Sequence, residues 1–120
     1  MRQARGRAAE GAALAHLQAR GLSLLTRNYR CRLGEIDLVM RDGDELVFVE
    51  VRARDRDTHG GAAGSVDAHK QRRLRLAARH YLMTHPRAAA WPARFDVVAI
   101  CGPDGENEPH WIRAAFDGAS

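Results

Sequence analysis

The chain has 120 residues and a formal net charge of +4, from 19 lysines and arginines against 15 acids. This length predicts one domain with a core of its own. The chain has no run of 18 apolar residues and no apolar stretch behind its charged N-terminus, which argues against a membrane-spanning helix and a secretory signal. Cys31 and Cys101 lack metal-ligand spacing, so we expect free thiols in a cytoplasmic protein.

The first predicted element is a helix over residues 4–20, with Leu14 and Leu17 on its apolar stripe and Gly21 as its stop. Glu10 lies four residues before Leu14 and seven before Leu17, so it shares their core-facing side. An acid in that position either belongs to a site or lies at the edge of the stripe and reaches water. For a single glutamate the second interpretation is the more common one.

A strand is predicted next at residues 22–31, and a β-hairpin follows over residues 34–52. Apolar and polar residues alternate on both sides of Asp42-Gly43 in this hairpin. The dipeptide favours a type I′ turn, which needs positive φ at both central residues. If these two residues form the loop, Arg41 pairs with Asp44, and the whole register of the hairpin follows.

That register places Asp37 opposite Phe48 and Glu50 opposite Glu35. Asp37 and Glu50 then share one face of the sheet with Arg52, as diagonal neighbours roughly 7–8 Å apart at Cα. Carboxylates held among apolar side chains repel one another and lose hydration, and a hard cation such as Mg²⁺ removes both penalties. The alternative is a sheet face that is open to water, and the hairpin alone does not decide between the two.

Residues 53–64 have no apolar period and contain three glycines, which predicts a loop and a candidate substrate clamp directly after the acidic strand. A second helix is predicted from an N-cap at Ser65 to Pro86, with Lys70 on its sheet-facing stripe. Its cations form a basic stripe and are Lys70, Arg72, Arg73, Arg75 and Arg79. Guanidinium groups match phosphate, so the stripe favours a polyanion, although a solvated helix face has the same pattern.

The remainder of the chain is predicted to be mainly extended. An Ala/Pro-rich link at residues 88–93 leads into a strand at residues 94–101, which has Phe95 and Val97 on one side. A turn is predicted at residues 102–105 and a short last strand at residues 110–113.

The order α-β-β-β-α-β, with acids on the second and third strands, resembles the restriction-endonuclease-like fold of the PD-(D/E)XK superfamily. The expected class is therefore α/β (α+β), with a mixed central sheet flanked by helices. The closest motif similarity is to the YraN-like family (UPF0102) of bacterial proteins, which resembles archaeal Holliday-junction resolvases. The matching motifs are Gly6-Arg-Ala-Ala-Glu10, Gly21, Arg27-Asn28, Gly34-Glu-Ile-Asp-Leu38, Phe48-Val-Glu-Val-Arg52, Val66 with Lys70, and Arg94-Phe-Asp-Val97.

The resemblance covers almost the whole chain and implies that residues 1–120 form a single endonuclease-like domain. It implies that Asp37, Glu50 and Glu10 are catalytic residues and ligands of Mg²⁺, with Mn²⁺ as a substitute. Arg52 is the fourth implied catalytic residue and takes the position of the superfamily's lysine. The residues expected to bind nucleic acid are Lys70, Arg72, Arg75, Arg79 and Arg54.

The function implied by the resemblance is a Mg²⁺-dependent DNA endonuclease that acts on branched or structured DNA in repair or recombination. Arginine cannot act as a base at ordinary pH, so Arg52 leaves open an alternative: a non-catalytic nucleic-acid-binding module with a vestigial nuclease site. A third reading is a small structural protein whose acids are only solvated. Resolvase-like relatives suggest a homodimer, and no membrane partner is expected.

Overall fold

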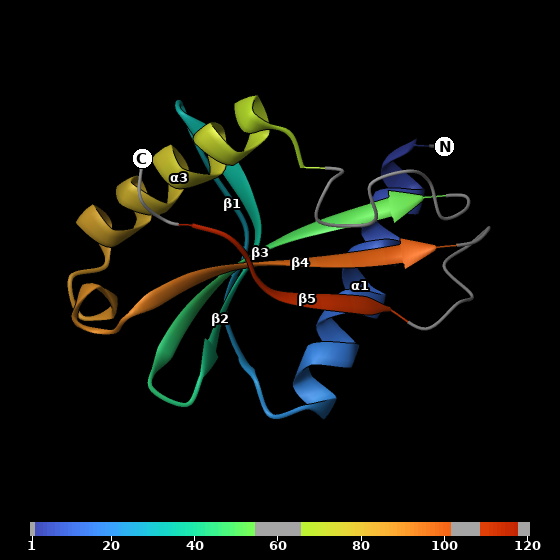
Figure 1. The fold of residues 1–120 in the computed structure, drawn as a ribbon, viewed down its shortest axis with the longest axis horizontal. Coiled ribbons are helices and arrows are strands. Elements are labelled where there is room, and N and C mark those ends of the chain that lie inside the picture. Colours follow the sequence, from blue (N-terminus) through green and yellow to red (C-terminus); the bar gives the residue numbers. More distant parts are fainter. Residues whose placement is uncertain (1, 55–65, 102–108, 118–120) are drawn as a thin grey trace.

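Two helices flank a five-stranded sheet (Figure 1). The computed structural model describes the backbone of residues 2–54, 66–101 and 109–117, and the side chains of residues 7–53, 66–100 and 109–117. Its elements are α1 (Arg2–Ala19), β1 (Ser23–Cys31), β2 (Gly34–Asp42), β3 (Glu45–Arg54), α3 (Ala68–Thr84), the 3-10 helix η1 (Ala88–Ala90), β4 (Ala93–Cys101) and β5 (His110–Phe116). No helix in these ranges is long and apolar enough to cross a membrane.

The sheet is mixed and follows the order β1-β2-β3-β4-β5. Neighbouring strands are antiparallel except β3 and β4, which run parallel. Parallel neighbours need a crossover connection, and the segment between β3 and β4 contains α3. The expected α+β class and the α-β-β-β-α-β order are therefore confirmed, and the fold is consistent with a restriction-endonuclease-like core. The last strand is longer than the expected 110–113.

Two apolar cores lie on the two faces of the sheet. In α1, Ala9, Ala13 and Leu17 recur every four residues, and their buried stripe covers one face. In α3, Leu74 and Tyr81 belong to the stripe that covers the other. The sheet residues packed beneath α1 are Leu38, Met40, Val47, Val49, Val98 and Ile100, and those packed beneath α3 are Ile36, Val39, Leu46, Phe48, Phe95 and Val97.

The start of α3 differs from the sequence prediction. Its N-cap is Asp67, whose Oδ1 accepts the backbone N–H of Lys70 at 2.8 Å, and the helix begins at Ala68. Both Ser65 and Asp67 are residue types that cap helices well, so composition alone did not separate them. The predicted N-cap at Ser65 and most of the predicted loop at 53–64 lie outside the described residues.

The turn between β2 and β3 also differs from the prediction. Asp42 pairs with Glu45, so the two loop residues are Gly43 and Asp44. Of these two loop residues, Gly43 alone has a positive φ, at 60°, which is the pattern of a type II′ turn. The predicted type I′ turn at Asp42-Gly43 is therefore wrong. The whole pairing is thereby displaced by two residues, which preserves the face on which β3 residues point.

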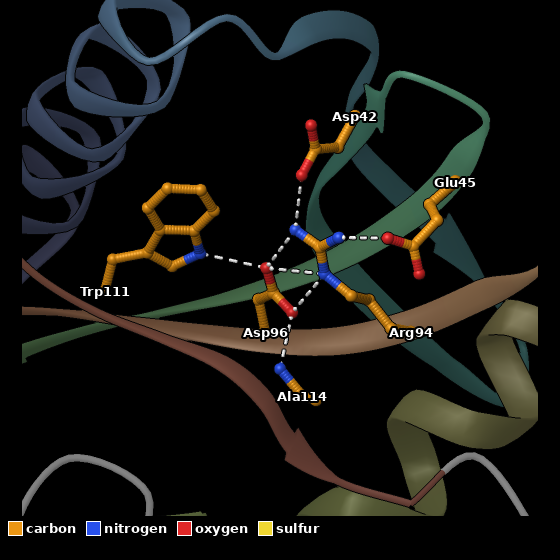
Figure 2. Close-up of polar contacts among 6 residues, drawn as sticks. All are labelled: Asp42, Glu45, Arg94, Asp96, Trp111 and Ala114. Atoms are coloured by element: carbon orange, nitrogen blue, oxygen red, sulfur yellow. Dashed lines mark hydrogen bonds and ion pairs between the residues drawn. The ribbon is translucent and has the colours of Figure 1, made fainter.

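A contact from β4 explains this register. Figure 2 shows the guanidinium of Arg94 between Asp42 and Glu45, to which it donates at 2.9 and 2.7 Å. Two carboxylates that share one guanidinium are held across from one another, and this ion pair places Asp42 in the ladder rather than in the loop. Local turn chemistry does not contain that information.

The same arginine is part of a buried network that holds β5. Arg94 Nε donates to Asp96, a fully buried acid, at 3.0 Å. Asp96 also accepts from Trp111 Nε1 and from the backbone N–H of Ala114, each at 2.9 Å (Figure 2). Ala114 has a φ of 47°, which is unusual for alanine, and the carboxylate holds its N–H in that conformation.

Candidate active site

The candidate site lies where β2 and β3 separate. Their ladder runs from Asp42 and Glu45 to Leu38 and Val49, and it stops before Asp37. Continued by one step, this register would place Asp37 directly across from Glu50, so the expected pairing of Asp37 with Phe48 is wrong. The Asp37 side chain replaces the missing ladder bond, because its Oδ2 accepts the backbone N–H of Val51 at 2.8 Å.

The side-chain alternation of β2 also breaks at Asp37. Ile36 packs in the core beneath α3, whereas Leu38, two residues away, packs in the core beneath α1. On β1 the flanking pairs place Asn28 across from Asp37, and Asn28 has a φ of 57°. Asparagine tolerates this left-handed conformation better than most residues do. The alternation predicted for this strand would put Ile36 and Leu38 on one face, so it is wrong at this point, and Asp37 lies at the bend.

Asp37 and Glu50 form a strongly interacting pair of acids. The Glu50 side chain is only 5% exposed. Burial is the largest cause that raises the pKa of Asp37, to about 8, and the charge and hydrogen bonding of Glu50 add to it. The hydrogen bond from the Val51 N–H lowers the pKa of Asp37, because it favours the charged carboxylate. In the metal-free protein the pair therefore retains one proton at neutral pH.

Glu10 adds a third negative charge, which has a smaller effect on Asp37 than that of Glu50. Its side chain is 14% exposed and lies 3.5 Å from Arg27 Nε on β1. The carboxylate raises the pKa of Asp37, as the smallest of the named causes. Glu10 thus lies at the side of the site, paired with Arg27, which belongs to the family motif Arg27-Asn28 and was not predicted to be a site residue.

Two cations contact the same oxygen of Glu50. Lys70 Nζ lies 3.0 Å from Glu50 Oε2, and Arg52 Nη1 lies 3.4 Å from it. Lys70 comes from α3, as its place on the sheet-facing stripe indicates, and Arg52 from the same strand as Glu50. The Nε of Arg52 is shielded from solvent, and no described residue supplies an acceptor for it.

A close backbone approach brings α3 to these acids. A Cβ at Gly34, the first residue of β2, would lie 2.5 Å from the carbonyl oxygen of Arg73. Only glycine therefore allows this contact, which places the N-terminal half of α3 against the start of β2. Lys70, one turn before Arg73, is thereby brought within reach of Glu50.

The arginines of α3 form a separate surface. At about 100° per residue, Arg72, Arg75 and Arg79 lie on the side of α3 away from Lys70. Arg75 Nη1 donates to the backbone oxygen of Asp117 at 3.3 Å, just after β5. A surface hollow of about 300 Å³ on this side is lined by Ala68, Arg72, Arg75, Leu76 and Arg79. Of the expected nucleic-acid-binding residues, only Lys70 adjoins the acids; the side chain of Arg54 lies outside the described ranges.

The acids fit Mg²⁺ as a pair rather than as a complete cage. Among the described residues, no three His, Cys, Asp or Glu side chains are close enough together to hold a metal ion. Mg²⁺ usually takes one or two carboxylates and completes its six oxygen ligands with water and substrate phosphates. Asp37 and Glu50 can supply such a pair, and Glu10 adds negative charge beside it.

Fold and site together define an α+β protein with a restriction-endonuclease-like core and a buried acid pair where two central strands separate. Residues 9–100 match the Uncharacterised protein family UPF0102, and the chain belongs to this family. A UPF0102 protein of Nitrosomonas europaea is 56% identical over 113 residues, which cover 94% of this chain and 93% of the relative. A UPF0102 protein of Stutzerimonas stutzeri is 54% identical over 115 residues, which cover 96% of each. The family indicated by the motifs is confirmed.

Proposed function

We propose that this protein is a Mg²⁺-dependent DNA endonuclease that works at the Asp37–Glu50 pair. The observation that carries the proposal is the pair itself. Two carboxyl groups are held close together where β2 and β3 separate, and their burial and mutual repulsion are unfavourable for the metal-free protein. The raised pKa of Asp37 lowers the stability of the metal-free protein as pH approaches neutrality, and strongly perturbed acids with nearby cations are typical of functional sites.

The cations beside the pair favour a phosphate substrate. Arg52 Nε has no acceptor among the described residues, and a shielded N–H without a partner is unfavourable by roughly 1–3 kcal/mol. The Arg52 side chain as a whole is 28% exposed, so its guanidinium group can present an N–H to a phosphate oxygen. Lys70 adds a second positive charge on the α3 side of Glu50. Together these groups supply acids for a metal ion and cations for the phosphate next to it.

In the proposed reaction, a water molecule gives up one proton to solvent and its oxygen bonds to phosphorus, while one P–O ester bond breaks and the leaving oxygen takes up a proton from solvent. When bound, Mg²⁺ would supply a Lewis acid that lowers the pKa of that water and offsets charge on the phosphate. Asp37 and Glu50 would hold the ion, and the Asp37 carboxyl would release its proton on binding. Arg52 would hold the phosphate through its guanidinium group and would not act as a base.

The three arginines on the side of α3 away from Lys70 support DNA as the polyanion. Arg72, Arg75 and Arg79 offer guanidinium groups along about two turns of α3, a spacing suited to successive phosphates of a nucleic-acid backbone. Contacts of this kind position the backbone and carry no sequence information. The similarity to resolvases adds branched DNA to the candidate substrates, and with it an assembly of two copies.

The test is a cleavage assay with Mg²⁺ or Mn²⁺ on duplex, single-stranded, flap and four-way-junction DNA. We expect cleavage of at least one substrate by the wild type and none by Glu50→Gln. The matched control is Glu35→Gln, which changes an exposed acid near the start of β2 and should cleave like the wild type. Equal cleavage by Glu50→Gln would indicate a contaminating nuclease. Binding without cleavage of any substrate would favour the non-catalytic binding module.

A further inference from the structure

We infer that Lys70 is an exchangeable cation of the acid site: its ammonium group pairs with Glu50 in the metal-free protein, yields that position to the metal ion, and then pairs with the substrate's phosphate. This inference rests on the proposed function. It assigns to Lys70 a positioning role that differs from that of the arginines on the far side of α3.

The contacts of Glu50 are the starting point. The carboxylate is almost fully buried and lies next to Asp37, so its charge needs a partner inside the protein. Lys70 Nζ and Arg52 Nη1 supply that partner at one and the same oxygen, Oε2, with Lys70 the closer at 3.0 Å. A divalent ion bound through Oε2 would meet both positive charges at short range, so at least one of them would have to move away.

The two cations differ in how easily they can move. Arg52 is part of β3, its side chain is 28% exposed, and its Nε is sealed from solvent. The Lys70 side chain is 44% exposed and ends a flexible four-carbon stem. Lys70 also borders an open hollow of about 380 Å³. The residues around this hollow are Glu35, Asp67, His69, Lys70, Arg73 and Leu74.

The backbone of Lys70 is held in place while its side chain is free to turn. Its N–H is bound by the Asp67 cap at 2.8 Å, and the helix is fixed to β2 by the contact between Gly34 and Arg73. An ammonium group that leaves Glu50 therefore stays within one side-chain length of the site. Because the hollow beside Lys70 opens to solvent, the proposal has the ammonium group turn through it to meet a phosphate at the metal-bound pair.

The consequence is a competition that can be measured without catalysis. Removing the Lys70 charge takes away a cation that repels the metal ion at Oε2, so metal affinity should rise. It also takes away a phosphate contact, so DNA affinity at saturating metal should fall. A residue that served only to stabilise the fold would not produce these two opposite changes.

The experiment compares Lys70→Met with Arg73→Met, which removes a cation from the same hollow that has no ion pair with Glu50. Mn²⁺ binding is followed by calorimetry without DNA, together with Tm in chelator and in saturating Mn²⁺. We expect Lys70→Met to bind Mn²⁺ roughly three- to tenfold more tightly than the wild type, since like charges a few ångströms apart repel strongly. Its Tm should be lower in chelator and should rise more with Mn²⁺. Arg73→Met should follow the wild type.

DNA binding supplies the second readout. In saturating Ca²⁺, used as a divalent ion to compare binding, Lys70→Met should bind duplex DNA less tightly, with a salt dependence lower by about one phosphate contact. Lys70→Gln, which keeps a neutral donor for Glu50, repeats the comparison if Lys70→Met proves unstable. Unchanged Mn²⁺ affinity in both Lys70 variants, with cleavage retained by the wild type, would overturn this inference alone. No Mn²⁺ binding by any variant would overturn the proposed function as well.

Discussion

The Asp37 carboxyl keeps its proton at neutral pH, because burial and the Glu50 charge raise its pKa from 3.8 to about 8. Between these two pH values the folded protein holds a proton that the unfolded chain has released. The free energy of unfolding therefore falls as pH rises through this window, by at most about 1.4 kcal/mol per pH unit. The contribution is fully present below about pH 4 and lost by about pH 8.

Asp37→Asn should remove this dependence. The amide oxygen can still accept the Val51 N–H, and no charge develops beside Glu50. We expect the variant to be more stable than the wild type in chelator at pH 7, with a difference that grows from pH 5 to pH 8. Urea unfolding across this range measures it. Glu35→Gln, an exposed change near the start of β2, should retain the wild-type slope, and parallel slopes for wild type and Asp37→Asn would contradict the raised pKa.

Arg52 is the residue at which the chain departs from the nuclease pattern. If it holds the phosphate, Arg52→Lys should keep or raise the cleavage rate, because lysine restores the superfamily's residue. Arg52→Ala should lower the rate by roughly 10²–10³-fold, as the loss of other preorganised donors does. Metal binding should survive in both variants, since Asp37 and Glu50 remain.

An ion pair with Glu50 that only stabilises the fold predicts a different pattern for Arg52. Arg52→Ala would then lower Tm in chelator, Mg²⁺ would restore it, and the cleavage rate would stay unchanged. Measuring Tm with and without Mg²⁺ beside the cleavage rate separates the two roles. A stability effect with an unchanged rate would exclude Arg52 from the reaction.

At the scale of the elements, the contact between β2 and α3 positions the site. Gly34→Ala would place a methyl group 2.5 Å from the carbonyl oxygen of Arg73, and backbone cannot yield as a flexible side chain can. We expect a loss of roughly 1–3 kcal/mol, as for other overpacked contacts, together with weaker pairing of Lys70 and Glu50 as α3 moves out.

Gly11→Ala is the matched control for Gly34→Ala. A Cβ at Gly11, inside α1, has nothing within 4 Å outside its own helix, and alanine favours helix over glycine by roughly 0.5–1 kcal/mol. Chemical denaturation should therefore show opposite signs for the two substitutions. Equal stability of Gly34→Ala and the wild type would mean that α3 is not held by this contact.

The sequence predicted which elements form and which faces most of them bury. The spacing of Leu14 and Leu17, the alternation around Phe48, and the stripe that carries Lys70 depend only on helical and strand periods. Glu10, Asp37 and Glu50 were predicted to meet, although only Asp37 and Glu50 form a close pair. The predictions of helices and strands succeeded where local periodicity and the tertiary fold agree.

The details that sequence could not provide come from contacts between distant segments. The hairpin register is set by Arg94, 52 residues beyond Asp42, which no rule for local turns includes. The bend at Asp37 depends on a left-handed Asn28 on another strand. Arg94 and Asp96 do carry a signal that could have been used: alternation places both on the apolar face of Val98 and Ile100, where a charged pair needs partners.

On the scale of the whole molecule, the acid pair lies on one side of α3, and Arg72, Arg75 and Arg79 lie on the other. Replacing Arg72, Arg75 and Arg79 with alanine should weaken binding to all DNA sequences alike. It should also reduce the slope of log affinity against log salt by about 0.9 for each lost phosphate contact.

The cleavage rate of this triple variant at saturating DNA should stay near that of the wild type, because none of the three arginines contacts Glu50 in the structure. Fluorescence anisotropy at several salt concentrations, beside single-turnover rates, is the measurement. Unchanged binding would show that the stripe is only a solvated helix face.

The central claim is that Asp37 and Glu50 act as one unit that holds a metal ion for phosphodiester hydrolysis. Its most direct test is the single-turnover cleavage rate in Mg²⁺ of the wild type, Asp37→Asn, Glu50→Gln and the double variant. Residues that work as a unit are not additive, so each single change should remove the Mg²⁺-dependent rate, by at least roughly 10²–10³-fold, and the double change should remove little more. A wild-type cleavage rate in either single variant would contradict the account. So would a fold-loss in the double variant equal to the product of the two single fold-losses.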